Sequence, residues 1–426
     1  MDIFKNKNFT WMFLGRILTN VGDSLYAVAA MWLVYDLGGS TFYTGLAGFL
    51  SIIPRLIQFF SGPLVDRLPI RPILIYTQLL QAILLLIVPL ASYLNFLSIS
   101  LVLIITPILT SLNMFVYPAQ MAALPKFLKE KDLTKGNSLF TIAYQGIEIT
   151  SNAISGILIV LIGAISIYVV DAVAFLLGAY IFSLIRMPIE KNVNPQKSIR
   201  LEQSIVSKYI SELLDGLKII IFTPLSRLLY GVIIINLAMG ATFVVLPAFG
   251  SDKGGPEIYG LLLMAQALGS LLGALITPYL KLDNIPIGLL YANAFTLSGL
   301  AWGLSIFAPW NWLTIVIYGL AWIPGGVTNI VINTVIQKGI PEKLLGRVFS
   351  ATISISGIAS PLGGLVGGIF GVLVGSGYII LFSGLMVLLV GVIWFLDSVT
   401  RNLPSAIEID HSTFGTSSIS GYSKSL

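Results

Sequence analysis

The sequence predicts an all-α membrane protein in which twelve transmembrane helices form two pseudo-symmetric six-helix bundles, and three observations support this class. Of the 426 residues, 56% are hydrophobic and 10% are charged, whereas about 25% of the residues of a soluble domain are charged. The apolar residues form long runs without strict alternation, which favours helices over a β-barrel. The two halves of the chain also resemble each other weakly.

Each apolar run is long enough to span a bilayer, which takes about 20 helical residues. The predicted spans cover residues 10–36, 43–65, 72–94, 97–122, 138–163, 167–186, 226–249, 257–280, 286–308, 312–336, 348–374 and 377–397. The spacing predicts an N-terminal bundle at 1–186, a cytoplasmic central loop with an amphipathic helix at 187–225, a C-terminal bundle at 226–399 and a disordered cytoplasmic tail at 400–426.

The basic residues lie on alternate connections, which sets the orientation by the positive-inside rule. Lys5 and Lys7 precede the first span, and further Lys and Arg residues cluster in every second loop and in the central loop. We therefore expect a multi-pass protein of a cell membrane, of prokaryotic type, with both termini in the cytoplasm. The net charge of +5 then reflects orientation and attraction to anionic lipid, not nucleic-acid binding.

The composition also excludes several chemistries. Cys is absent and the single His, His411, lies in the polar tail. This excludes disulfides, thiolate or imidazole metal sites, and nucleophiles that need a His base. No phosphate-binding loop for ATP is present. We expect no cofactor, no metal and no enzymatic activity, and we expect a monomer.

An internal repeat is visible at an offset of 215–216 residues. Asn20 aligns with Asn236, Tyr43 with Tyr259 and Pro125 with Pro341, and Gly45-Leu46 aligns with Gly260-Leu261. Repeats of this kind are typical of secondary transporters, in which the substrate site lies between the halves at mid-membrane.

The loop after the second span reads GPLVDRLPIRP and is similar to the G-x-x-x-D-R-x-G-R-R/K motif of the major facilitator superfamily. Pro69 stands in place of the second glycine. Other segments resemble the drug:proton antiporter branch that includes macrolide-efflux proteins and enterobactin exporters: residues 11–40, YPAQMAALPKFL, VVDAVAFLLGAY, IQKGIPEKLLGRVFS and SPLGGLVGG. The antiporter motif of that branch's fifth span is absent, since only Gly146 and Gly156 are present there.

The resemblance implies a gate at the cytoplasmic mouth. A carboxylate there can accept hydrogen bonds from the start of the eleventh span and interact with its helix dipole. The residues that match this gating motif are Gly62, Asp66, Arg67 and Arg71, with Arg347 on the opposite side. The alternative is that Arg67 and Arg71 only anchor the loop on the cytoplasmic side.

Charged residues inside spans are costly, at about 2.5–3.5 kcal/mol each, and are functional candidates. Asp23, Glu148 and Arg55 lie near mid-membrane and are the candidates for proton coupling. A carboxyl group in a low dielectric holds its proton tightly, and a nearby guanidinium weakens that hold. The alternative is a structural ion pair. We expect Arg16 to snorkel or gate near the inner face, and Asp171 to make a structural hydrogen bond.

Polar and aromatic side chains on spans 1, 4, 5, 7, 8 and 10 are candidates for the substrate cavity. By the resemblance, spans 1, 2, 4, 5, 7, 8, 10 and 11 line the cavity and gates, and spans 3, 6, 9 and 12 support them. The cavity candidates are Asn20, Tyr26, Asn113, Tyr117, Tyr144, Asn236, Phe243, Gln266, Asn329 and Asn333. Glycine rows on spans 8 and 11 are expected to allow close helix contact.

The function that these features favour is a secondary active transporter that couples efflux of amphipathic, macrolide-like drugs to protons by alternating access. Its partners would be a small-molecule substrate, protons and the lipid bilayer. The alternatives are an exporter or uniporter of a native metabolite, siderophore or lipid without proton antiport. A membrane scaffold is a third alternative, which the charges inside the spans disfavour.

Overall fold

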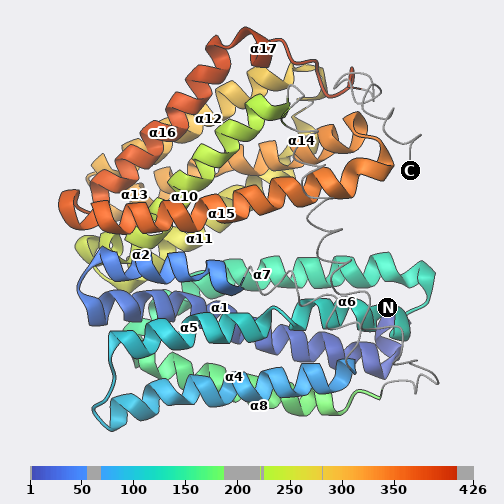
Figure 1. The fold of residues 1–426 in the computed structure, drawn as a ribbon, viewed down its shortest axis with the longest axis vertical. Coiled ribbons are helices and arrows are strands. Elements are labelled where there is room, and N and C mark those ends of the chain that lie inside the picture. Colours follow the sequence, from blue (N-terminus) through green and yellow to red (C-terminus); the bar gives the residue numbers. More distant parts are fainter. Residues whose placement is uncertain (1, 55–68, 187–220, 222–224, 281, 410–426) are drawn as a thin grey trace. The chain divides into compact units, whose positions relative to one another are not determined.

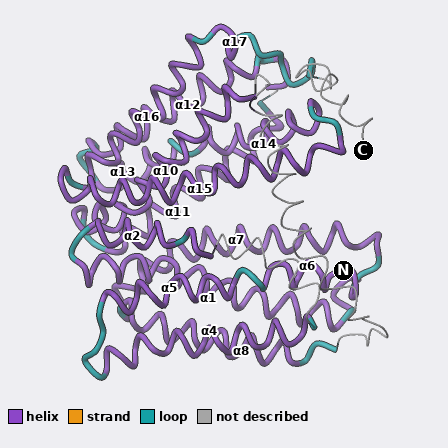
Figure 2. Tube along the Cα trace, in the orientation of Figure 1, coloured by secondary structure: helices purple, strands orange, loops and turns teal. Residues whose placement is uncertain are grey.

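The computed structural model describes residues 2–54, 69–186, 221, 225–280 and 282–409 (Figure 1). These residues are helical almost throughout, and the pairing between Pro286 and Ser405 is an isolated β-bridge (Figure 2). The all-α fold predicted from the sequence is therefore confirmed. The predicted amphipathic helix of the central loop lies outside the described residues.

Ten helices in the described residues are long and apolar enough to cross a membrane, and a bent pair, Lys135–Asn152 with Ile154–Ile162, makes an eleventh. A shorter apolar helix, Thr41–Pro54, corresponds to the start of the predicted second span. The rest of that span lies outside the described residues, so twelve remains a prediction. The chain is a multi-span membrane protein.

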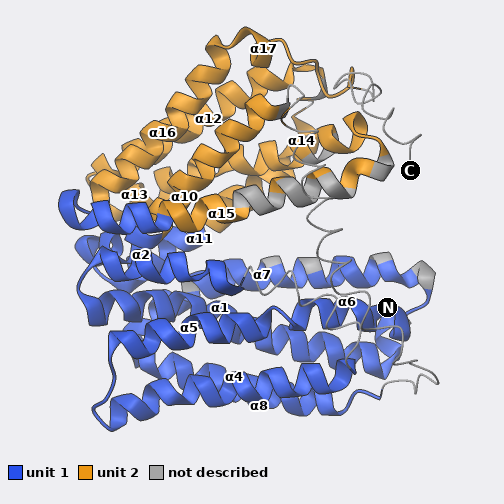
Figure 3. Cartoon of the chain, viewed as in Figure 1, with its two compact units in different colours: residues 1–189, 244–264, 364–376 blue, residues 190–243, 265–363, 377–426 orange. Residues whose placement is uncertain are grey.

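The chain divides into two compact units, coloured blue and orange in Figure 3. Unit 1 comprises residues 1–189, 244–264 and 364–376, and unit 2 comprises the remainder. The helices that begin in the first half of the chain are η1 (Asp2–Lys5), α1 (Lys7–Gly38), α2 (Thr41–Leu50), α4 (Ile70–Tyr93), α5 (Ile99–Asn113), α6 (Val116–Phe127), α7 (Glu130–Ile162) and α8 (Ala164–Ser183).

The second half contributes helices to both units, because the unit boundary falls inside four of them. Its helices are α10 (Leu225–Lys253), α11 (Pro256–Ile276), η3 (Thr277–Tyr279), η4 (Leu282–Asn284), α12 (Ile287–Leu304), η5 (Ser305–Phe307), α13 (Asn311–Leu320), α14 (Ile323–Gly339), α15 (Glu342–Val374), α16 (Ser376–Leu396) and α17 (Ser398–Arg401).

Local sequence sets where the first helices begin and end. The Asn6 side chain accepts hydrogen bonds from the amides of Asn8 and Phe9 and so caps the start of α1. At the other end Gly39 adopts a left-handed conformation with φ of 59°, which a glycine allows at little energetic cost. Ser40 then caps α2 by accepting from the amide of Phe42.

The fourth and the tenth predicted spans, which the internal repeat aligns with each other, are each divided into two helices near a proline. Proline removes an amide donor and clashes with the carbonyl four residues earlier. Pro118 places that clash at Met114, where α5 gives way to α6. Pro324 places it at Leu320, where α13 ends before α14 begins. Both spans are therefore interrupted where a proline disrupts the helical hydrogen bonding.

Helix α8 packs along α1 and α4 within unit 1. Small residues allow α1 and α8 to approach closely: Gly178 faces Thr19, and Gly15 lies under the ring of Phe182, which is fully buried. A Cβ atom on Gly22 would collide with the carboxyl group of Asp171. This packing fixes Asp171 against α1.

Two glycine pairs also make close helix crossings within unit 1. A Cβ built on Gly45 of α2 would lie 2.7 Å from Cα of Gly368, and one on Gly260 of α11 would lie 2.8 Å from Cα of Gly156. Thr41 adds a 2.9 Å hydrogen bond to the carbonyl of Gly368. Gly45 and Gly260 are the residues that the repeat aligns, so both crossings require glycine at the same repeat position.

Unit 2 has its own aromatic and glycine contacts. The rings of Trp302 and Trp322 lie 5.0 Å apart, and Tyr291 donates a 2.7 Å hydrogen bond to the carbonyl of Thr328. Backbone atoms of Gly319 lie against Gly269 of α11. The close helix contact expected of the glycine row on the eighth span is therefore present.

Residues 400–409 are ordered, contrary to the disordered tail predicted from residue 400. Ile287 donates its amide to the carbonyl of Pro404, and Lys338 donates to the carbonyl of Ala406 at 3.0 Å. Ala406 and Ile409 are buried. The apolar side chains of this segment therefore pack on unit 2, a tertiary contact that the polar composition of the tail did not indicate.

Candidate functional site

The polar face of α1 meets α5 at Asp23. Asp23 lies near the middle of α1 and is half-buried, and its carboxylate accepts a 3.0 Å hydrogen bond from the side-chain amide of Asn113. Asn113 is the last residue of α5, next to the bend before α6. The structure thus brings together a proton-coupling candidate and a substrate-cavity candidate.

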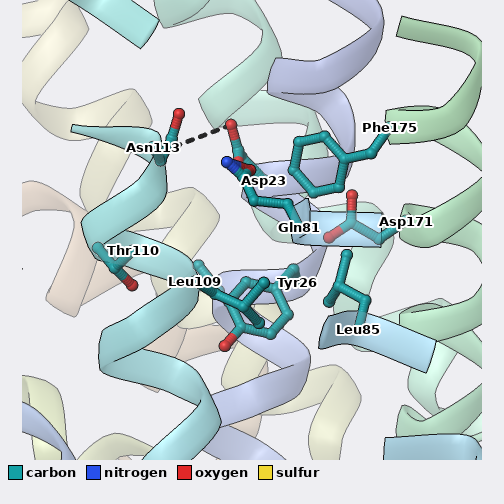
Figure 4. Close-up of a pocket in the computed structure, with 10 residues that line it drawn as sticks. Asp23, Tyr26, Gln81, Leu85, Leu109, Thr110, Asn113, Asp171 and Phe175 are labelled. Carbon is teal, nitrogen blue, oxygen red and sulfur yellow. Dashed lines mark hydrogen bonds between the residues drawn. The ribbon is translucent and has the colours of Figure 1, made fainter. Parts of the chain in front are cut away.

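A cavity of about 160 Å³ opens beside this pair, enclosed by α1, α4, α5 and α8 (Figure 4). All of its walls belong to unit 1. Its lining residues are Asp23, Tyr26, Ala27, Gln81, Leu85, Leu109, Thr110, Asn113, Asp171 and Phe175. The walls therefore combine two carboxyl groups and three uncharged polar side chains with aromatic and aliphatic surface, a composition that suits an amphipathic guest.

The prediction for Asp171 was wrong. We expected a structural hydrogen bond, but neither carboxyl oxygen has a hydrogen-bond partner among the described residues. The side chain is fully buried and lies on the cavity wall with Asp23. The supporting sixth span thus contributes an ionisable group to the cavity.

The prediction that Arg16 snorkels to the inner face was also wrong. Arg16 is buried, and its Nε atom donates to Gln120 at 3.2 Å and to the hydroxyl of Tyr144 at 3.1 Å. Its Nη1 atom donates to Thr19 at 3.2 Å, and Tyr144 donates in turn to Gln120. This network ties α1 to α6 and α7, and it gives the buried guanidinium of Arg16 hydrogen-bond acceptors for its N–H groups.

The other proton-coupling candidates do not join Asp23 in the described part of the chain. Glu148 is exposed on α7, and no hydrogen bond or ion pair connects it to a described residue. Arg55 lies outside the described residues. The suggestion that Arg55 pairs with either carboxyl group stays a prediction.

The remaining cavity candidates lie in different surroundings. On unit 1, Asn20 is half-buried, Tyr26 is buried and Tyr117 is exposed. On unit 2, Asn236 donates to the carbonyl of Val232 in its own helix, Gln266 accepts from Tyr318 at 3.2 Å, and Phe243 and Asn329 are exposed. The side chain of Asn333 lies outside the described residues.

Most of the gating motif also lies outside the described residues: Gly62, Asp66, Arg67 and the side chain of Arg347. Arg71 is described, and it donates a hydrogen bond to the carbonyl of Ser183 at the end of α8. This contact favours anchoring for Arg71, since it neutralises the carbonyl end of a helix dipole.

Sequence reasoning missed the uncharged wall of the cavity, above all Gln81 and Phe175, and it missed Gln120 as a partner of Arg16. A signal for the first two was available. Gln78 and Gln81 are the two amide side chains of helix α4, and Phe175 follows Asp171 by one helical turn. No group of three His, Cys, Asp or Glu residues that could hold a metal ion is found in the described ranges.

Comparison with known proteins agrees with this architecture. The Major Facilitator Superfamily profile matches residues 12–363, and the chain belongs to this family of transporters. The multidrug efflux pump Tap of Mycolicibacterium fortuitum is 26% identical over 386 residues, covering 88% of this chain and 92% of Tap. Tap of Mycobacterium tuberculosis H37Rv is 27% identical over 364 residues, covering 83% and 84%.

Solved transporters share the fold at low sequence identity. A bacterial homologue of the human lysosomal transporter Spinster superposes with a TM-score of 0.67 and 13% identity, covering 92% of this chain and 96% of the homologue. A bacterial homologue of the iron transporter ferroportin gives 0.64 and 14%, covering 92% and 99%. The major facilitator fold predicted from the sequence is therefore confirmed, and the protein is a membrane transporter.

Proposed function

We propose that this transporter exports amphipathic drugs across the cell membrane in exchange for protons, and that Asp23 is its proton-binding group. The observation that carries the proposal is the position of Asp23: half-buried on the middle of α1, hydrogen-bonded to Asn113 and lining a cavity with apolar walls. A carboxyl group in such a place can hold either a proton or the positive end of a substrate, but not both.

The cavity walls support contact with one part of an amphipathic, macrolide-like substrate, because a cavity of about 160 Å³ is smaller than a whole drug molecule. Tyr26, Leu85, Leu109 and Phe175 offer apolar and aromatic contact, while Thr110 and Asn113 offer hydrogen-bonding groups. The relatives named multidrug efflux pumps support drug efflux as the function. Part of the cavity thus suits a substrate's apolar body and part suits its polar groups.

The exchange follows from alternating access. With the cavity open to the cytoplasm, the substrate displaces the proton from Asp23. With the cavity open to the outside, a proton displaces the substrate. In this proposal the protein is a monomer in the plasma membrane with both termini in the cytoplasm, residues 1–186 and 226–399 are the two moving bundles, and the motif at Gly62–Arg71 gates the cytoplasmic mouth.

The test uses everted membrane vesicles that hold a respiration-driven pH gradient, followed with a fluorescent pH probe. We expect macrolides or amphipathic dyes to release protons from vesicles that contain the parent protein, but not from vesicles that lack it. Substrate uptake by the parent protein without any proton movement would overturn antiport. It would then favour an exporter or uniporter of a native metabolite, siderophore or lipid.

A further inference from the structure

Asp171 has features that the proposed function does not use. It lies on α8, its side chain is 0% exposed, and both of its carboxyl oxygens lack a hydrogen-bond partner among the described residues. Its carboxyl group lies on the wall of the Asp23 cavity, between Phe175 and Leu85 in the view of Figure 4. Gly22 of α1 leaves the space that this carboxyl group fills.

A second unpaired polar group lies on the same wall. Gln81 of α4 is 1% exposed, lines the cavity, and its Nε2 atom has no hydrogen-bond partner among the described residues. Buried polar side chains are nearly always paired, with protein groups or with ordered water. A cavity of about 160 Å³ is large enough for several water molecules. The unpaired groups of α4 and α8 therefore indicate a hydrated path beside Asp171.

The charges around Asp171 decide which form of the carboxyl group is stable. The titratable groups that face it are Asp23 and Tyr26 on α1 and Tyr168 on α8 itself. The facing side chains of α4 and α5 are uncharged, and Glu148 on α7 is exposed. Among the described residues, no Lys or Arg lines the cavity.

Arg16 makes no hydrogen bond to Asp171, because its donors bond to Gln120, Tyr144 and Thr19. An ionised Asp171 would be a buried charge without a counter-charge or a donor, which is strongly unfavourable. Two carboxylates on one small cavity also resist simultaneous ionisation. The geometry therefore favours a proton on Asp171 in this conformation.

We propose that Asp171 is a second proton-binding carboxyl group of the Asp23 cavity and exchanges its proton with Asp23 through water. The inference rests on the proposed proton coupling at Asp23. When the cavity is open to the outside, the acid form of Asp171 gives its proton to the Asp23 carboxylate, and this proton displaces the substrate. Asp171 is then protonated again from the outside. The cavity thus holds a reserve proton on a helix that was expected only to support the fold.

The test is infrared spectroscopy of the purified full-length protein without substrate, in which a protonated carboxyl group has its own carbonyl stretch. Isotope labelling of aspartate assigns the band to aspartate, and Asp171→Asn assigns it to this residue. We expect the band in the parent at neutral pH, its loss in Asp171→Asn, and a shift of its frequency or its pH midpoint in Asp23→Asn. Asp36→Asn, which changes an exposed carboxyl group of α1, should leave the band unchanged.

Either of two results would overturn the inference: no aspartate band that Asp171→Asn removes, or a band that Asp23→Asn leaves unchanged. If Asp171→Asn does not fold, Gln81→Leu replaces it, because loss of the neighbouring amide should shift the labelled band. A parent protein that transports substrate without moving protons contradicts the proposed function instead. The infrared result, obtained without substrate, distinguishes the two failures.

Discussion

The side-chain amide of Asn113 donates a 3.0 Å hydrogen bond to the carboxylate of Asp23, and so links the bend between α5 and α6 to the middle of α1. A change in the charge of Asp23 therefore acts directly on the point where the fourth span is divided. Any movement of that bend in turn changes the surroundings of the carboxyl group. This reciprocity is what coupling between a proton and a conformation requires.

Asn113→Leu tests this link. A hydrogen bond to a charged group contributes about 1.5–3 kcal/mol, so its loss should lower drug-driven proton flux by about tenfold or more. The measurement is proton release from everted vesicles at equal protein content. Asn293→Leu, which removes an exposed amide that bonds only within its own helix, is the matched control and should keep the parental flux.

The buried network around Arg16 should contribute to stability. Gln120→Leu removes the acceptor that both Arg16 and Tyr144 use, and leaves a buried guanidinium short of partners. We expect a loss of about 1–3 kcal/mol in the free energy of unfolding, seen as a lower melting temperature of the purified protein. Tyr144→Phe leaves Gln120 bonded to Arg16 and should lower the melting temperature less. Equal melting temperatures for Gln120→Leu and the parent would contradict a structural role for the network.

The crossing of α2 and α15 should tolerate no side chain at Gly45. A methyl group there would lie 2.7 Å from Cα of Gly368, a backbone contact that only a shift of a helix can relieve. We expect Gly45→Ala to slow transport severely while the protein still reaches the membrane. Gly146→Ala is the matched control, since nothing lies within 4 Å of its added methyl group. Parental transport by Gly45→Ala would show that the crossing is looser than described.

The turn after α16 should become less stable at acidic pH. The hydrogen bonds from the side chain and amide of Thr400 lower the pKa of Asp397 below its ordinary value. A lowered pKa means that this carboxylate stabilises the folded turn fully above the ordinary pKa, and that the contribution disappears as the pH falls through the lowered value. We expect the Thr400 amide to lose protection from hydrogen exchange in that acidic range. In Asp397→Asn the protection should already be reduced at neutral pH.

Much of the fold could be predicted because a bilayer leaves few alternatives. The apolar runs fixed the helices, and the prolines at 118 and 324 fixed the two divided spans. The cavity was harder, because sequence gives the depth of a residue along a span but not the direction in which its helix faces. Asp171 was assigned to the wrong environment for this reason.

A finer pattern does indicate the true face of α8. Tyr168, Asp171, Phe175, Gly178 and Phe182 recur at three- and four-residue intervals, and all five are buried. This stripe combines large aromatic rings with a glycine, a pattern that is typical of a helix face packed against another helix. Asp171 shares that stripe and is therefore buried in protein. Arg16 is buried because it bonds to Gln120 and Tyr144. These residues lie more than 100 positions away in the sequence and could not be paired with Arg16 from one sequence.

The most direct test of the central claim compares two modes of transport by Asp23→Asn in vesicles. Substrate accumulation driven by a pH gradient requires the carboxyl group to exchange a proton, whereas exchange of labelled for unlabelled substrate requires only the cavity and its movement. We expect Asp23→Asn to lose gradient-driven accumulation while it keeps substrate exchange near the parental rate. Gradient-driven accumulation at the parental level in Asp23→Asn would contradict Asp23 as the proton-binding group.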